Sequence, residues 1–251
     1  MPGDTMRGRD QSADGVCVSF SGIDGAGKST QIGALRARAA EMGLQVRVIA
    51  FWDEVAALTG IREGAGHTLF GGEKGVGTPE APVNRRDKNV QSWPMSCVRL
   101  GLYLLDAFSL RRAKKRALRS GADLVIFDRY MYDELANLNL RNPLMRAYVR
   151  WTMRLVPRPQ VSYLLDADPV AARARKPEYP LEFLHANRQR YLELSRLIGG
   201  MTVIAPMAME DAKQEVLRHA AALLSASETR KRCSEADAKL DGPFPGRLSA
   251  G

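Results

Sequence analysis

Residues 16–30 read VCVSFSGIDGAGKST, and this stretch decides the fold. A short apolar run gives way to glycines and then to residues that open a helix, which is the order of a phosphate-binding loop. Gly22, Gly27, Lys28 and Ser29 fit the pattern Gly-x-x-x-x-Gly-Lys-Ser/Thr. Glycines let the backbone turn its N–H groups inward around an anion, and the following helix adds the positive end of its dipole. The stretch therefore predicts a site for the phosphates of a nucleotide.

Each part of this loop has an expected role in holding ATP and Mg²⁺. Lys28 is expected to reach the β and γ phosphates, and the hydroxyl of Ser29 is expected to ligate the metal. The backbone between Gly22 and Thr30 is expected to hold the donor nucleotide. The residues inside that range are Ile23, Asp24, Gly25, Ala26 and Gly27.

Composition bounds the class of protein. The chain has 251 residues, 45% of them hydrophobic and 26% charged, which suits one soluble globular domain and predicts a cytoplasmic protein. The formal net charge of +9 raises the question of nucleic acid, but no module of interleaved aromatic and basic residues is present. We therefore expect a small anionic substrate and neither a nucleic-acid nor a membrane partner. Cys17, Cys97 and Cys233 have no paired spacing and are expected to be reduced thiols.

Strands and helices are expected to alternate along the rest of the chain. Further strands are predicted at 45–51, 123–127, 160–165 and 202–205, and helices at 28–42, 94–120, 143–155, 169–176, 181–198 and 210–224. Because parallel strands need helical crossovers, this order predicts an α/β domain with a parallel sheet. We expect one domain over residues 15–225, a disordered segment at 1–14 and a disordered tail at 226–251.

Two segments are expected to act on the substrate side. Residues 52–93 are rich in glycine and proline and are predicted to form a cover, the alternative being a passive surface excursion. Arg173, Arg175 and Lys176 precede a proline-bounded loop, so residues 173–180 are predicted to form a short lid that brings positive charge to a transferring phosphate. The alternative for these cations is a solvated helix end stabilised by its dipole.

A charged pair directly follows the predicted strand at 123–127. Ligands of open α/β sheets sit beyond the carboxyl ends of the strands, so Asp128 and Arg129 are expected to face the same crevice as the loop. Asp128 is predicted to hold the metal or the substrate, and Arg129 to clamp a phosphoryl oxygen through its planar fork. The alternative is a surface ion pair.

Four stretches together resemble the thymidylate kinase family. They are FSGIDGAGKST at 20–30, Asp128-Arg129-Tyr130, LLDADP at 164–169 and YLEL at 191–194, and the resemblance runs from about Val16 to Leu224. It implies a P-loop NTPase-type three-layer sandwich with a five-stranded parallel sheet flanked by helices, and transfer of the ATP γ-phosphate to a nucleoside monophosphate. It also allows a homodimer.

The resemblance assigns roles to single residues. Asp24 is similar to the loop carboxylate that meets the sugar hydroxyl. Arg129 is similar to the clamp between donor and acceptor phosphates, and Arg175 to the first arginine of the lid.

The chain departs from the family where the acceptor is recognised. It has FWDE at 51–54 where the family has an arginine motif, and Phe108 falls at the position of the arginine that reads the thymine. Asp133 and Leu138 replace a serine and a glutamine. We therefore expect Phe51, Asp53, Phe108 and Tyr130 to contact the acceptor, together with Asp24 and Arg129, and we expect poor discrimination between bases.

Two other functions fit the same motifs. A kinase of a nucleoside or of another small-molecule hydroxyl would need Asp128 or Asp53 to take the proton of the acceptor. A regulator that binds ATP without transferring phosphate would keep the loop and would turn over no acceptor.

Overall fold

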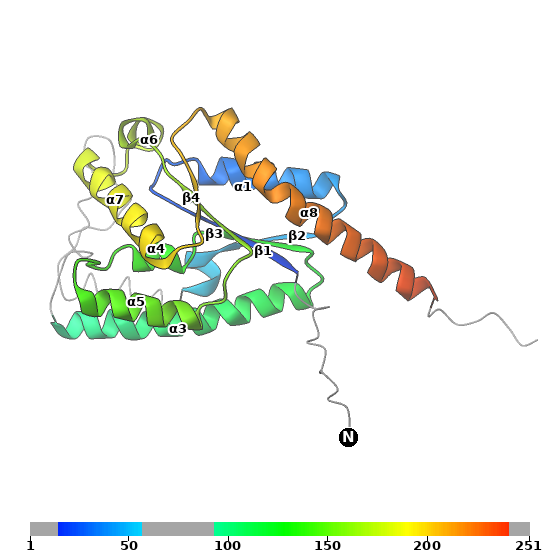
Figure 1. Ribbon diagram of the computed structural model, residues 1–251, viewed down its shortest axis with the longest axis horizontal. Coiled ribbons are helices and arrows are strands. Elements are labelled where there is room, and N and C mark those ends of the chain that lie inside the picture. Colours follow the sequence, from blue (N-terminus) through cyan, green and yellow to red (C-terminus); the bar gives the residue numbers. More distant parts are fainter. Residues whose placement is uncertain (1–14, 57–92, 241–251) are drawn as a thin grey trace, which may run out of the picture.

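The computed structural model describes residues 15–56 and 93–240, and a five-stranded parallel sheet lies at its centre (Figure 1). The strand order is β2-β3-β1-β4-β5. The strands are β1 (Val16–Ser21), β2 (Val46–Ala50), β3 (Leu124–Asp128), β4 (Val161–Leu165) and β5 (Thr202–Ile204). The predicted α/β class, with a five-stranded parallel sheet flanked by helices, is confirmed. Three segments lie outside the described residues: 57–92, which makes up most of the predicted cover, and 1–14 and 241–251, which belong to the segment and the tail predicted to be disordered.

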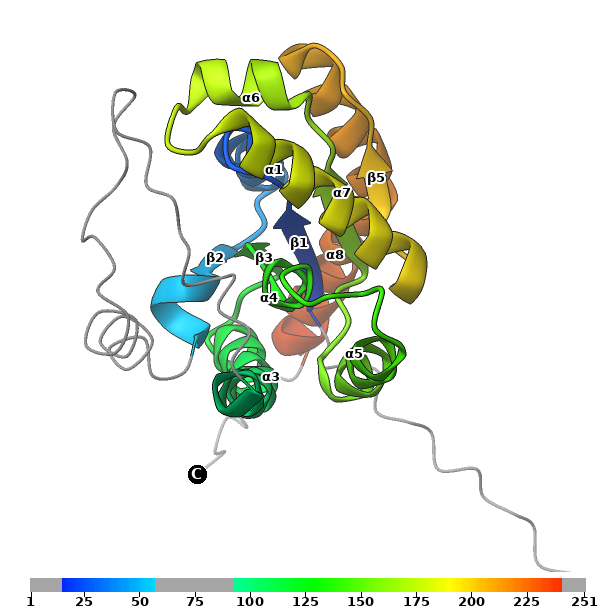
Figure 2. The same cartoon turned by 90° about the vertical axis from the view of Figure 1, so that its left-hand side faces the viewer.

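Helices cover both faces of the sheet. Along β1, Val16, Val18 and Phe20 pack into one apolar cluster and Cys17 into the other, as the alternation of a strand requires. The first cluster is closed by α1 (Lys28–Glu41) and α8 (Met209–Leu240). The second is closed by α3 (Trp93–Arg119) and α5 (Pro143–Leu155), which lie side by side on the opposite face (Figures 1 and 2). Residues 20–22 thus emerge at the centre of the sheet.

Short elements gather beyond the carboxyl ends of the strands. A π-helical turn, η1 (Phe51–Val55), follows β2 directly, and α4 (Met131–Leu135) follows β3. The helix α6 (Pro169–Arg175) follows β4 and leads through a short loop to α7 (Leu181–Ile198). Neither η1 nor α4 was predicted, because five residues are too few to display a helical period.

The last helix is longer than the sequence predicted. α8 continues through Leu240, so the prediction that the helix ends at 224 and a disordered tail begins at 226 was wrong for residues 226–240. The apolar period that marked the helix stops at Leu224, but ion pairs continue beyond it, between Glu228 and Arg232 and between Lys231 and Asp123. No helix in the described part of the chain, α8 included, combines the length and apolar character that a membrane span needs.

Positive charge is concentrated on the two neighbouring helices α3 and α5. α3 carries six cations between Arg111 and Arg119, and α5 carries Arg146, Arg150 and Arg154 on one side. Within residues 15–56 and 93–240, none of these nine side chains has an ion pair or a hydrogen bond, whereas the cations of α8 pair repeatedly with neighbouring glutamates. We call α3 and α5 the basic helices.

Candidate functional site

The loop that joins β1 to α1 leaves backbone donors available for an anion. Gly25 and Gly27 adopt left-handed backbone angles, with φ of +79° and +88°. Gly27 is the N-cap of α1, and no side chain caps the first turn. The first N–H groups of the helix therefore remain available as hydrogen-bond donors to a ligand. The helix dipole favours a ligand with negative charge at this end. Ser29 and Thr30 are exposed in the same turn.

Lys28 is buried beneath this loop. Its ammonium donates hydrogen bonds to the carbonyls of Gly22 and Ile23, each at 2.9 Å, and the residue is only 7% exposed. Burial lowers the pKa of Lys28 to about 8, and the charge of Arg129 adds to this shift while nearby carboxylates, Asp128 among them, oppose it. An ammonium has three N–H donors, so one donor remains for a ligand.

Arg129 approaches the loop from the neighbouring strand. Its guanidinium forms an ion pair with Asp24 of the loop through Nη2, and its Nη1 lies 3.3 Å from Oδ1 of Asp133. The backbone of Arg129 has a φ of +67°, which is rare for a residue with a side chain, and its N–H donates to the carbonyl of Phe20 at 3.0 Å. Burial lowers the pKa of Arg129, but the two carboxylates outweigh burial and raise it above its ordinary value. The ion pair between Arg129 and Asp24 thus connects the end of β3 to the loop.

Asp133 contacts Arg129 and is itself held by several hydrogen bonds. Its carboxylate accepts hydrogen bonds from the hydroxyl of Ser21 at 2.6 Å, the hydroxyl of Tyr191 at 2.7 Å and the backbone N–H of Tyr130 at 3.0 Å. Burial, and after it the charge of Asp133, raises the pKa of Tyr191 well above its usual value. We call Asp24, Arg129, Asp133, Tyr191 and Ser21 the Arg129 cluster.

The lid predicted at 173–180 begins at the end of α6 and lies against the loop. Nε of Arg175 donates to the carbonyl of Gly25 at 2.8 Å. A Cβ on Gly25 would lie 2.1 Å from the carbonyl oxygen of Ala172, so α6 and the loop meet backbone to backbone. Arg173 is half-buried on the same helix and has no hydrogen-bond partner among the described residues. Of the predicted lid cations, Arg175 is the one that contacts the loop.

This contact predicts that Gly25→Ala destabilises the protein. The new methyl would collide with Ala172, and a left-handed φ costs an alanine about 1–2 kcal/mol before the collision is counted. We expect a clear fall in the free energy of unfolding, measured with urea. Gly33→Ala in α1 is the matched control, because its Cβ would meet nothing within 4 Å. That change should stabilise the protein by about 0.5–1 kcal/mol. Equal urea midpoints of unfolding for Gly25→Ala and Gly33→Ala would contradict the close contact between Gly25 and Ala172.

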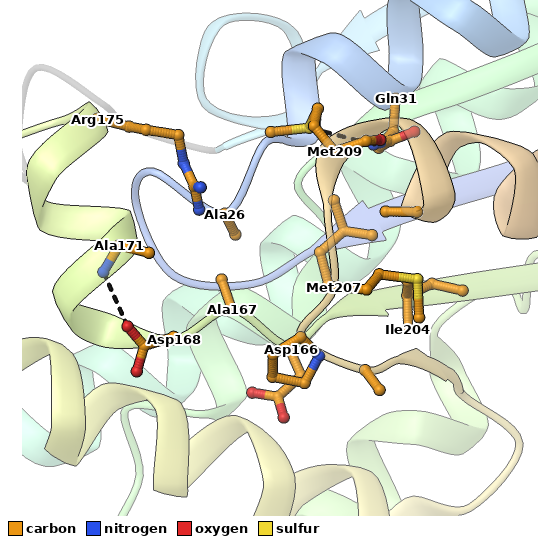
Figure 3. A pocket seen from close by; sticks show the side chains of 14 residues that line it. Ala26, Gln31, Asp166, Ala167, Asp168, Ala171, Arg175, Ile204, Met207 and Met209 are labelled. Atoms are coloured by element: carbon orange, nitrogen blue, oxygen red, sulfur yellow. Dashed lines mark hydrogen bonds between the residues drawn. The ribbon is translucent and has the colours of Figure 1, made fainter.

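A cavity of about 160 Å³ opens beside the loop (Figure 3). Its walls are Ala26 of the loop, Gln31 of α1, residues between Leu165 at the end of β4 and Arg175 at the end of α6, and residues between Ile204 at the end of β5 and Ala212 in α8. Gln31 is among the lining residues and is 1% exposed, and its Oε1 has no hydrogen-bond partner among the described residues. Arg175 and Asp168 lie on the opposite wall. The cavity thus has polar groups at two sides, and the small apolar side chains of Ala26 and Ala167 lie between them in this view.

The predicted metal ligands lie on α1, which follows the loop, and on β3, the strand beside β1. Ser29 is exposed in the first turn of α1, and Asp128 is half-buried at the end of β3, opposite Phe20 of β1 in the sheet. Among the described residues there is no group of three or more histidines, cysteines or carboxylates that could hold a metal by itself. The two oxygen donors of Ser29 and Asp128 suit Mg²⁺, which takes one or two protein oxygens and completes its coordination shell with phosphate and water.

Of the six residues predicted to contact the acceptor, Asp24 and Arg129 form an ion pair, but the other four are not brought together. Phe51 is fully buried in the core, and Tyr130 is 1% exposed with its hydroxyl hydrogen-bonded to the carbonyl of Pro157. Asp53 is exposed in η1. Phe108 is 50% exposed on the side of α3 opposite its buried residues. Phe51 and Tyr130 serve the core, and neither Asp53 nor Phe108 joins the Arg129 cluster.

Sequence reasoning missed the functional position of Asp133, Tyr191 and Ser21. Asp133 was recognised only as a departure from the family. A partial signal for it exists in the chain, because Arg129 and Asp133 have opposite charges and are only four residues apart, although Arg129 precedes α4 and is not helical. No such signal links Asp133 to Tyr191, which lies 58 residues away. The sequence matches no protein-family model and no curated protein.

Proposed function

We propose that the protein transfers the γ-phosphoryl group of ATP to a nucleoside monophosphate, using Gly22–Ser29 as a P-loop in a fold of the thymidylate kinase type. One observation carries the proposal: the buried ammonium of Lys28 at the start of α1 and the guanidinium of Arg129, which follows β3, converge on the loop that precedes an uncapped helix N-terminus. Lys28 lies under the loop, and Arg129 reaches it through Asp24. Such a set of donors suits the negative charge of a transferring phosphoryl group.

The proposed chemistry needs positioning and charge more than covalent catalysis. An oxygen of the acceptor phosphate attacks the γ-phosphorus in line, the bond to the β-phosphate oxygen breaks, and ADP leaves. Lys28, Arg129 and Arg175 stabilise the charge of the group in transit. Ser29 and Asp128 would hold Mg²⁺, which neutralises charge on the phosphates when bound. The cavity beside Gln31 would receive the base of ATP.

Transfer to a hydroxyl is the second candidate, and the carboxylates around the loop favour it. The two buried cations, Lys28 and Arg129, have three carboxylates near them, those of Asp24, Asp128 and Asp133. Among the described residues, the summed formal charge of these five groups is therefore not positive. Asp128 would then accept the proton of the acceptor hydroxyl, a step that an anionic phosphate acceptor does not require.

An acceptor screen tests these candidates. ADP formation is measured with thymidine, deoxyuridine, cytidine and uridine monophosphates and with the corresponding nucleosides. We expect turnover with more than one monophosphate, because Phe108, which takes the place of the family's base-reading arginine, is exposed on the far side of α3 and has no polar group that could select thymine. A kcat/KM for thymidine monophosphate about a thousandfold above all others would contradict the expected breadth. Turnover with nucleosides alone would establish the second candidate, and ATP binding without any turnover would establish a regulator.

The buried position of Lys28 predicts a pH dependence of ATP binding. The ammonium of the free protein loses its proton as pH rises through about 8, whereas bound phosphates favour the protonated form. Binding must therefore take up a proton above that pH, and affinity should fall by up to about tenfold per pH unit. Titration calorimetry in two buffers of different ionisation enthalpy measures the uptake. Lys28→Arg is the control, because a guanidinium stays charged and its profile should be flat. A flat wild-type profile would contradict the prediction.

A further inference from the structure

Asp133 is the most enclosed charged group near the loop. Its side chain is 2% exposed, and its two oxygens receive four hydrogen bonds, from Ser21, Tyr191, the backbone of Tyr130 and Nη1 of Arg129. These partners come from β1, from α7 and from the segment that joins β3 to α4. A carboxylate bound in this way from three sides has a fixed place and a fixed orientation.

Arg129 is the only cation within ion-pair distance of Asp133 among the described residues. A buried carboxylate needs a counter-charge, so the position of Asp133 dictates where the guanidinium must lie. The left-handed backbone of Arg129 needs support from its surroundings, and the adjacent N–H of Tyr130 is bound by the same carboxylate. Asp133 therefore holds Arg129 at both the main chain and the side chain.

The two carboxylates on Arg129 differ in exposure. Asp24 is 17% exposed at the loop, whereas Asp133 is enclosed. An arriving phosphate can replace Asp24 at Nη2 from the solvent side, while Nη1 stays bound to Asp133 behind it. The guanidinium of Arg129 would then already have the orientation needed to bind the phosphate before the substrate arrives.

We propose that Asp133 is a positioning residue that aims the Arg129 guanidinium at the transferring phosphoryl group. This inference rests on the proposed phosphoryl transfer. It assigns to Asp133 a role in the chemical step and none in direct contact with substrate. The effect of Asp133 should therefore pass entirely through Arg129.

The test is a double-mutant cycle on the full-length protein, with an acceptor that the wild type uses. Asp133→Asn keeps the shape and removes the charge, so we expect kcat to fall about tenfold or more with little change in the KM for ATP. In an Arg129→Ala background the same change should lower kcat less than about twofold further, because the group it positions is already absent. A purely structural role would give the same additional loss in both backgrounds.

Tyr132→Phe is the matched control. Tyr132 lies on the same short helix and is buried, but its hydroxyl pairs with Ser162 at 3.0 Å and does not touch Arg129. Its kcat should stay near that of the wild type. A loss for Asp133→Asn no larger than for Tyr132→Phe, or losses that multiply in the cycle, would overturn the inference.

A second set of variants applies if Asp133→Asn does not fold. Tyr191→Phe and Ser21→Ala each remove one hydrogen bond from the carboxylate and leave its charge in place. Each should lower kcat severalfold in the wild-type background and not in the Arg129→Ala background, and equal losses in both would overturn the inference. Absence of turnover in the wild type with every acceptor would instead refute the proposed function, so the two failures are distinct.

Discussion

Replacing Lys28 by alanine is expected to abolish phosphoryl transfer. Lys28 is buried at the end of the loop, and its two bonds to the carbonyls of Gly22 and Ile23 leave one of its three N–H donors for the phosphates of the proposed ATP. Initial rates of ADP formation at saturating ATP and acceptor measure the effect.

The change also leaves the carbonyls of Gly22 and Ile23 without their donor, so stability must be measured beside activity. Thermal unfolding monitored by circular dichroism shows whether the variant is folded at the assay temperature. A folded variant that keeps more than about a tenth of the wild-type rate, a loss below about 1.4 kcal/mol, would overturn the assignment of the loop.

Arg129→Lys should be nearly as damaging although it keeps the charge. An ammonium cannot bind Asp24 and Asp133 with two separate nitrogens and still present a planar fork to a phosphate. We expect kcat to fall about a hundredfold, measured at saturating substrates.

The control for this change is Arg218→Lys on α8. Arg218 also donates to a carboxylate through two of its nitrogens, Nε and Nη2, which bind the two oxygens of Glu215. This pair is exposed and far from the loop in sequence. Its activity should equal that of the wild type. A silent Arg129→Lys variant would make Arg129 a structural residue and would remove the clamp from the proposed mechanism.

Strands and the loop could be predicted because their signals are local. The β-branched runs at β1 and β3 and the glycines that follow β1 are contiguous in the chain, so composition and spacing reveal them. The placement of Arg129 beside the loop follows from the rule for the carboxyl ends of parallel strands. The structure bears out that placement through the ion pair with Asp24.

Side-chain orientation could not be predicted in the same way. Phe108 was placed by a count along α3, and a helix turns by about 100° per residue, so an error of two positions moves a side chain to the opposite face. Tyr130 follows Arg129 immediately, yet its hydroxyl binds the carbonyl of Pro157 and its ring packs in the core. The partners of Asp133 belong to elements far apart in the chain, and only folding brings them together.

The basic helices have a consequence for how copies of the protein meet in solution. Nine cations on α3 and α5 lack a described negative partner, so two molecules that approach through this face repel each other. The range of that repulsion is about 10 Å at 0.1 M salt and shrinks as salt is added. Contacts through this face should therefore strengthen with ionic strength, and light scattering should show the osmotic second virial coefficient falling. On a cation-exchange surface the same face should orient the molecule, leaving the opposite side with α1 and α8 toward the solvent.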